Sequence, residues 1–189
     1  MNSNVIISTE RLILRNWEKS DIAPFVQMNS DPKVMKYFPG LMSSDQTLQF
    51  MERIKLHFEE YNYGLFAVDE KSTGEFIGFI GFSHPRFESF FTPCVEIGWR
   101  LRSEHWGKGL ATEGAKACLD YGFNVLNFDS IYSFTAIPNV PSINVMKKTG
   151  MKHIGEFNHP SLSEGSWLCK HTVYKISLSE WEADHYKCE

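Results

Sequence analysis

The order in which hydrophobic patterns follow one another constrains the fold of this chain more than any single residue does. Alternating apolar and polar residues over 64–84 and 93–104 predict three successive strands, the first two joined as a hairpin through turn residues 70–74. A strictly alternating doubly wound sheet would need a helix between consecutive strands. The pattern therefore predicts a mixed α/β fold, with one mixed sheet and helices on both of its faces.

The other expected elements surround this run of strands. A strand over 9–17 comes first, and Ser20 or Asp21 can cap the helix that follows it. A second helix is expected from about Ser44 to Tyr61, with Ser44 or Asp45 as its cap. The remaining elements are a helix from Leu110 with Val125 on its apolar side, a strand over 130–137, a short helix over 141–150, strands over 151–157 and 166–178, and a helical turn over 179–186.

Composition favours an ordinary globular protein. The 189 residues fit one domain, and the 42% hydrophobic and 14% aromatic content is enough for a sizeable core. The net charge of −4 argues against nucleic acid as a partner and weakly favours cationic substrates such as amines. The spacing of the four cysteines predicts no zinc site. Without a secretion signal or a membrane segment, the expectation is a reduced cytoplasmic protein that binds no metal.

A glycine turn precedes the helix expected from Leu110. Gly107 and Gly109 flank Lys108, so the backbone at the start of this helix is bare. Free N–H groups and the helix dipole make such a turn a site for an anion, most often a phosphate. A simple tight turn is an equal alternative. The turn matches neither a Walker loop nor, in its place after the expected fourth strand, a dinucleotide fingerprint.

The turn and its surroundings resemble a known family. The segment VEIGWRLRSEHWGKGLATEGAKACLDYGF over 95–123 resembles the acetyl-CoA signature of the GNAT superfamily, particularly its RimJ/RimL-like branch of ribosomal-protein N-terminal acetyltransferases. Trp106 stands where the general pattern Q/R-x-x-G-x-G/A has Gln or Arg, but W-G-K-G-x-A-T-E is common in this branch. TERLILRNWEKSD, STGEFIGFIGF, PSINVMKKTGM and VYKISLSEW also resemble segments of the branch, in the same order. The resemblance covers about 8–182 and implies that 1–189 form a single N-acetyltransferase domain.

The resemblance implies a fold and a cofactor site. The sheet is expected to be twisted and mostly antiparallel, with a pair of strands that splay apart to admit coenzyme A. The pyrophosphate of acetyl-CoA would lie on the backbone from Trp106 to Ala111, and the pantetheine arm along the strand near Ile97 to Leu101. The implied cofactor-binding residues are Ile97, Trp99, Leu101, Trp106, Gly107, Lys108, Gly109, Leu110, Ala111, Thr112, Asn139 and Ser142.

Acetyl transfer to an amine needs a base and an acid for the departing thiolate. The resemblance makes Glu96 a candidate base, often acting through water; the alternative is a solvated or salt-bridged strand residue. It places Asn139 on the cofactor and Ser142 near the thiol, although both residue types also cap helices. Tyr174, whose phenol can protonate a thiolate, is a candidate acid, although most strand tyrosines are packing residues.

Two aromatic groups are candidates for binding surfaces. In the RimJ/RimL-like branch the region that here contains Trp17, Tyr37, Phe38 and Pro39 shapes the acceptor site, although Trp17 fits a core position better. His171 stands where this branch often has an acidic residue, which leaves the acceptor contacts there open. A second aromatic group, expected as an exposed binding or dimer contact, consists of Phe87, Phe90 and Phe91.

The sequence therefore predicts an acetyl-CoA-dependent N-acetyltransferase that acts by direct attack in a ternary complex. Its acceptor is a primary amine, either the N-terminus of a ribosomal or other protein or a small amine. A CoA-binding sensor without catalysis is one alternative. An acyltransferase for a longer acyl group, which would need a wider gap near Ile97 and Ile137, is another. The chain is expected to be a monomer or a homodimer that binds neither nucleic acid nor membranes.

Overall fold

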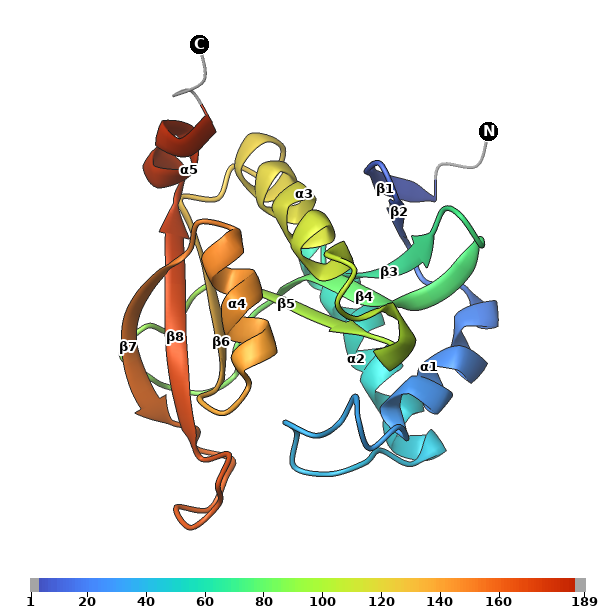
Figure 1. Cartoon of the computed structure of the whole chain (residues 1–189), viewed down its shortest axis with the longest axis horizontal. Helices are drawn as coiled ribbons and strands as arrows, with labels where there is room; N and C mark the ends of the chain where they lie inside the picture. The colour runs from blue at the N-terminus through green and yellow to red at the C-terminus, as the bar shows by residue number, and fades with distance from the viewer. Residues whose placement is uncertain (1–3, 186–189) are drawn as a thin grey trace.

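A computed structural model describes residues 4–185 of the chain. Its strands and helices follow the predicted order, with one additional strand at the start (Figure 1). The strands are β1 (Val5–Ser8), β2 (Leu12–Arg15), β3 (Leu65–Glu70), β4 (Glu75–Ser83), β5 (Glu96–Leu101), β6 (Ser130–Ala136), β7 (Lys152–Asn158) and β8 (Lys170–Ser177). The helices are α1 (Ile22–Asn29), α2 (Ser44–Tyr61), α3 (Leu110–Asn124), α4 (Val140–Lys148) and α5 (Leu178–His185), with short 3-10 turns at Lys19–Asp21 and Ser103–His105.

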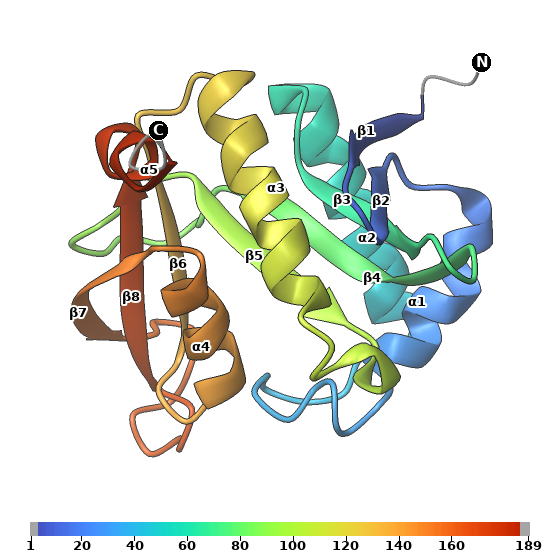
Figure 2. The ribbon, with the colours of Figure 1, turned by 45° about the horizontal axis from the view of Figure 1, so that its top comes forward.

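All eight strands belong to one sheet, in the order β1-β2-β3-β4-β5-β6-β8-β7. Every neighbouring pair is antiparallel except β5 and β6, which are parallel and register only at Glu96 and Tyr132. One backbone hydrogen bond, from Tyr132 N to Val95 O, supports this junction at 2.9 Å. Beyond it the two strands separate, as Figure 2 shows. The predicted mixed, mostly antiparallel sheet with a splayed strand pair is confirmed.

Helices cover both faces of the sheet, and each face has its own core. On one face, α3 packs on the central strands, and residues such as Leu12, Ile80 and Leu119 are fully buried beneath it. On the other face, α1 and α2 cover a smaller core that includes Phe25 and Phe79. Because side chains alternate along a strand, β5 sends Ile97, Trp99 and Leu101 toward the first core, and Glu96, Gly98 and Arg100 face the other side of the sheet.

Several local expectations need correction. Strand β1 was not expected, because its apolar run is short; it forms by pairing with β2. The cap of α2 is Ser43, whose hydroxyl accepts from Gln46 N, rather than Ser44 or Asp45. Val125 is 57% exposed just beyond α3, so it does not belong to the apolar side of that helix.

The remaining findings concern cysteines and membranes. Cys94, Cys118 and Cys169 are free thiols, and Cys188 lies outside the described residues. Across residues 4–185, no helix has the length and apolar character needed to cross a bilayer.

Candidate functional site

The glycine turn has the backbone conformation that an anion site requires. Gly107 and Gly109 have φ values of 73° and 80°, in the left-handed region that glycine adopts most easily. Gly109 caps α3, and its carbonyl accepts the first backbone hydrogen bond of the helix, from Glu113 N at 3.0 Å. The N–H groups before Glu113 therefore have no acceptor within the helix. The N–H of Trp106 is different, because it already donates to Ser103 O at 3.3 Å.

A clamp from the other end of the chain holds this turn. Arg11 donates through Nε to Glu113 Oε2 at 2.6 Å and through Nη1 to Lys108 O at 2.8 Å. Thr9 Oγ1 donates to Glu113 Oε1 at 2.6 Å. The carbonyl of Lys108 is thus fixed, while Lys108 itself does not line the adjoining cavity. No sequence pattern indicates this clamp, because its partners lie about a hundred residues apart.

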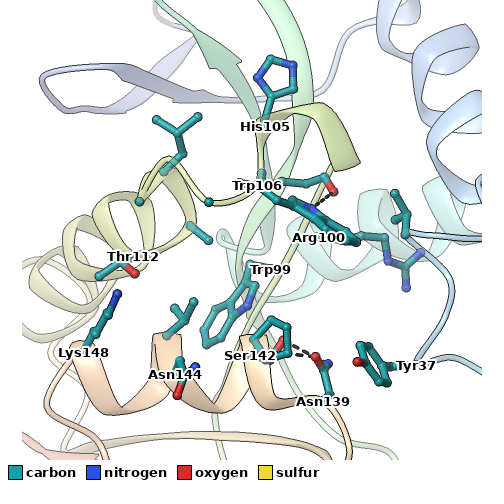
Figure 3. A pocket seen from close by; sticks show the side chains of 18 of the residues that line it. Tyr37, Trp99, Arg100, His105, Trp106, Thr112, Asn139, Ser142, Asn144 and Lys148 are labelled. Carbon is teal, nitrogen blue, oxygen red and sulfur yellow. Dashed lines mark hydrogen bonds between the residues drawn. The ribbon is translucent and has the colours of Figure 1, made fainter.

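The turn opens onto a cavity of about 480 Å³, called here the glycine-turn cavity. The start of α3 forms one wall and α4 forms the opposite wall, where Figure 3 shows Lys148 and Thr112 pointing toward each other across the space. A Cβ added at Gly107 would meet nothing within 4 Å, so the approach to the backbone is open. The predicted cofactor residues that line this cavity are Trp99, Leu101, Trp106, Gly107, Gly109, Leu110, Ala111, Thr112, Asn139 and Ser142.

The start of α4 is held by the predicted capping pair. Asn139 Oδ1 accepts from Ser142 N at 3.4 Å, and Asn139 Nδ2 donates to Thr135 Oγ1 at 2.9 Å and to Ser142 Oγ at 3.1 Å. Capping is therefore confirmed for Asn139. Because Ser142 Oγ accepts from this amide, its own hydroxyl proton is available to another acceptor.

A second cavity, of about 400 Å³, lies on the α1–α2 side of the splayed strands and is called here the Glu96 cavity. Glu96 projects into it from the last point where β5 and β6 are paired. Ser83 Oγ donates to Glu96 Oε2 at 3.2 Å. Burial raises the pKa of Glu96 to about 8, although the Ser83 hydrogen bond lowers it. Glu96 forms no salt bridge within residues 4–185, so the salt-bridged alternative does not hold.

The two cavities meet beside the splayed strands. Gly98, which has no side chain and would find nothing within 4 Å of an added Cβ, leaves room along β5. Ile97, fully buried, lines the Glu96 cavity only. The residues that line both cavities are Tyr37, Phe38, Trp99, Arg100, Asn139 and Ser142.

Two predicted residues lie elsewhere. Tyr174 lines neither cavity; it is buried in the core on the α3 face, with its ring 5.5 Å from that of His153. Trp17 is a core residue, as the alternative held: its indole N–H donates to Leu65 O at 2.6 Å and its ring packs 4.8 Å from Phe25. The structure therefore does not bring either of them to the site.

The aromatic cluster between β4 and β5 is mostly packed rather than exposed. Phe87 stacks on Phe157 at 5.7 Å, and Phe91 is buried against Phe134 at 5.6 Å. Only Phe90, 60% exposed, fits the expected surface contact.

Two histidines that had no assigned role line the Glu96 cavity. The rings of His159 and His171 lie 5.0 Å apart, and burial lowers the pKa of both. His171 Nδ1 lies 3.1 Å from Cys169 O, so the proton sits on Nδ1 and Nε2 is free to accept one. Their positions 12 residues apart in the sequence gave no motif that could have revealed the pair.

Arg100 is the other residue that the sequence analysis left without a role. It is 9% exposed, lies 4.0 Å above the ring of Phe38, and donates through Nη1 to Asn29 Oδ1 at 2.6 Å. Burial lowers the pKa of Arg100 to about 10, which still leaves it cationic at neutral pH. Because side chains alternate along β5, the sequence indicates that Arg100 shares a face with Glu96. It does not indicate that Arg100 lies beneath the loop that carries Phe38.

A splayed parallel strand pair, a free helix N-terminus and a buried carboxylate define a class of acyl-transfer enzyme fold, and comparison with known proteins agrees. The profile described as "Acetyltransferase (GNAT) domain" matches residues 11–152. The chain therefore belongs to the GNAT acetyltransferase family, and it is an N-acetyltransferase. Members of this family take their acetyl group from acetyl-CoA. No group of three or more potential metal ligands occurs among residues 4–185.

Individual relatives cover nearly the whole chain. It is 36% identical to the uncharacterized protein YkkB of Bacillus subtilis over 85% of this chain and 94% of that one, and 32% identical to the uncharacterized N-acetyltransferase YnaD of the same organism over 93% and 98%. A GNAT acetyltransferase structure from Bacillus anthracis matches with a TM-score of 0.75 and 29% identity, over 92% of this chain and 98% of that one.

More distant relatives act on different acceptors. The spermidine N(1)-acetyltransferase of Escherichia coli is 26% identical over 85% of this chain and 83% of its own length. A ribosomal-protein-S5-alanine acetyltransferase from Vibrio fischeri shares the fold, with a TM-score of 0.71 and 20% identity over 92% of this chain and 97% of that one.

Proposed function

We propose that this enzyme transfers the acetyl group of acetyl-CoA to a primary amine held in the Glu96 cavity, by direct attack in a ternary complex. The observation that carries the proposal is the meeting of two unlike cavities beside the splayed strands. One ends in free backbone N–H groups, and the other ends in a buried carboxylate. Both a protein N-terminus and a small amine satisfy this description. The RimJ/RimL-like branch stays a prediction.

Acetyl-CoA fits the glycine-turn cavity by its charge and shape. The N–H groups from Gly107 to Thr112 would hold the pyrophosphate at the positive end of α3. Lys148 would add a cation from the opposite wall, where Figure 3 places its amine facing Thr112. Bare backbone at Gly98 supports a pantetheine arm along β5. The cavity therefore offers backbone donors and one flexible cation to the anionic end of the ligand.

Glu96 would serve as the base. An amine arrives mostly as an ammonium ion, and it must lose a proton before its nitrogen attacks the thioester carbon. The raised pKa of Glu96, about 8, brings its proton affinity close to that of an amine, so transfer costs little. The neutral nitrogen then forms a bond to the acetyl carbon, and the carbon–sulfur bond breaks. The nitrogen gives up a second proton as it becomes an amide and the thiolate takes up one proton, so that one proton in all is left on Glu96 or on water beside it.

Ser142 would meet the departing thiolate. Its hydroxyl lies where the two cavities join, and its oxygen already accepts from Asn139. The hydroxyl proton can therefore point to the sulfur and stabilise its negative charge. Tyr174, the acid predicted from the resemblance, has no part in this proposal, because it lines neither cavity.

The test is a screen of amines, peptides and purified ribosomal proteins with acetyl-CoA, with release of free thiol as the readout. We expect thiol release that depends on the acceptor. The acceptor should gain about 42 Da in mass, because an acetyl group replaces a hydrogen. Binding of CoA without thiol release from any acceptor would instead support the non-catalytic sensor. Faster release with longer acyl-CoA donors would support the other alternative.

A further inference from the structure

Arg100 is the buried cation of the site, and its charge has no counter-ion. Within residues 4–185 no carboxylate lies within ion-pair distance of it, and its hydrogen bonds all leave from Nη1, to Asn29 Oδ1 at 2.6 Å and more weakly to Met42 Sδ at 3.9 Å. Its Nε is buried and has no hydrogen-bond partner in the described part of the chain. A buried guanidinium normally faces a carboxylate, because desolvation of a lone charge is costly.

The guanidinium belongs to the ligand space rather than to the core. Arg100 lines both cavities, and Figure 3 shows it with Tyr37 at the end of the glycine-turn cavity away from Thr112 and Lys148. Aromatic rings pack against the guanidinium and stabilise the cation: Arg100 Cζ lies 4.0 Å from the ring centre of Phe38 and 5.4 Å from that of Phe79. Such rings hold the cation in one orientation without neutralising it. The guanidinium still has N–H donors to which the described residues offer no acceptor, and donors of this kind suit a carboxylate.

The two charges of the acceptor space lie on the same face of β5. Glu96 and Arg100 are four residues apart, with the bare Gly98 between them, so their Cα atoms are about 13 Å apart along the strand. A ligand that reaches both charges would have an amine at one end and an anionic group several bonds away.

We propose that Arg100 binds a carboxylate of the acceptor, so that the preferred substrate carries both an amine and a carboxylate rather than being a polyamine. The inference rests on the proposed amine acetylation at Glu96. A polyamine would bring further ammonium groups into a space where, among the described lining residues, Glu96 is the only acid and Arg100 repels cations. The acceptor class would then differ from that of the spermidine-acetylating relative.

The test compares matched acceptors that differ only in the remote charge. Amino acids with a terminal amine, from 4-aminobutyrate to 6-aminohexanoate, are each paired with their carboxamide, and spermidine serves as the polycation. We expect kcat/KM to favour the carboxylate by about tenfold or more at the chain length that spans the site, since charge-assisted pairs are the strong ones. Equal kcat/KM within every pair, or a preference for spermidine, would overturn the inference while leaving amine acetylation intact.

Two variants assign the preference to Arg100. Arg100→Gln removes the cation. Asn29→Asp keeps the cation but places a carboxylate where Asn29 Oδ1 now accepts the hydrogen bond from Arg100. Both should lose the preference for carboxylate over carboxamide, and Asn29→Asp, whose residue lines neither cavity, should still acetylate the carboxamide. Asn29→Asp keeps the test valid if Arg100→Gln does not fold, and Arg100→Lys should retain part of the preference. A preference that survives in Asn29→Asp would contradict the proposal.

Binding separates this inference from the proposed function. Calorimetric titration of 6-aminohexanoate and of its carboxamide into the CoA complex needs no turnover. Tighter binding of the carboxylate, lost in Asn29→Asp, supports the inference even if no acceptor is acetylated. If these variants instead weaken the binding of CoA and leave the carboxylate preference unchanged, Arg100 serves the cofactor and the inference is wrong.

Discussion

The two cavities that meet at the splayed strands differ in what forms their functional ends, which is backbone in one and buried side chains in the other. Backbone forms the functional end of the glycine-turn cavity, where the N–H groups of residues 107–112 have no backbone acceptor in the described part of the chain. Buried side chains make the functional end of the Glu96 cavity, where Glu96, Arg100 and His171 come from β5 and β8. The first needs glycine and a helix start, whereas the second needs charges held in a desolvated space.

This difference predicts how each cavity responds to substitution. A site made of backbone is damaged when a side chain fills it, and removal of a neighbouring side chain has little effect. A site made of buried ionisable groups is damaged when one group loses its charge, even if the shape is preserved. We therefore expect substitutions in the glycine-turn cavity to change mainly the affinity for the cofactor. Substitutions in the Glu96 cavity should change mainly the turnover rate.

The largest expected effect is on turnover in the Glu96 cavity. Glu96→Gln preserves size and the hydrogen bond from Ser83 but removes the base, so kcat should fall by roughly 10²–10⁴-fold. The Kd for CoA should remain nearly unchanged, because Glu96 does not line the glycine-turn cavity. Thiol-release kinetics and calorimetry measure the two quantities. The exposed Glu75→Gln is the control.

The pH profile sharpens this prediction. With a pKa of about 8, Glu96 is half ionised at that pH and mostly ionised only above it, so kcat/KM should rise with pH through about 8 and then level off. The rise should disappear in Glu96→Gln, measured with an acceptor amine of constant protonation over that range. A variant with wild-type turnover at neutral pH would remove Glu96 from the mechanism, and a variant that fails to fold would make it structural.

The second effect tests the backbone cavity. Gly109→Val should weaken CoA binding by about tenfold or more, because the side chain blocks approach to the N–H groups. It also strains the backbone, since a non-glycine residue at φ +80° costs about 1–2 kcal/mol. Gly74→Val is the matched control: its φ is +71°, it lies in the β3–β4 turn, and an added Cβ would meet nothing within 4 Å there, against only Arg11 Nη2 at 3.6 Å for Gly109. Both variants should lose similar thermal stability, but only Gly109→Val should lose affinity for CoA.

The same contrast explains what the sequence could predict. The glycine turn, the helix after it and the Asn139 cap are local, because each depends on residues close in sequence, and the structure confirms them. The Arg11–Glu113 clamp and the His159–His171 pair depend on strand order and register, which join distant segments. The local pattern of β8 gave no sign that the Tyr174 ring faces the core on the α3 side.

A smaller effect is expected for Lys148, the cation of the wall opposite the turn. Lys148→Ala should weaken CoA binding about twofold to fivefold at low salt, since exposed charge pairs are worth up to about 1 kcal/mol. Lys147→Ala is the matched control, because Lys147 is also exposed in the last turn of α4 but does not line the cavity. Higher ionic strength should reduce the difference between the two variants. Equal affinities would show that the backbone alone binds the anion.

The smallest effect concerns the hydroxyl that tunes the base. Ser83 Oγ donates to Glu96 at 3.2 Å, and this bond favours the ionised carboxylate and lowers its pKa. Ser83→Ala removes the bond, so the midpoint of the kcat/KM profile should move to higher pH, by a fraction of a unit. Activity at pH 7 should then fall about twofold to threefold, because less Glu96 is ionised, and it should return to the wild-type level well above pH 8. Recovery at high pH distinguishes a change in proton affinity from lost packing, which would lower activity equally at every pH. A midpoint that moves downward would mean that the hydroxyl stabilises the protonated acid instead, and the Glu96 cavity would then be tuned in the direction opposite to the one that base catalysis requires.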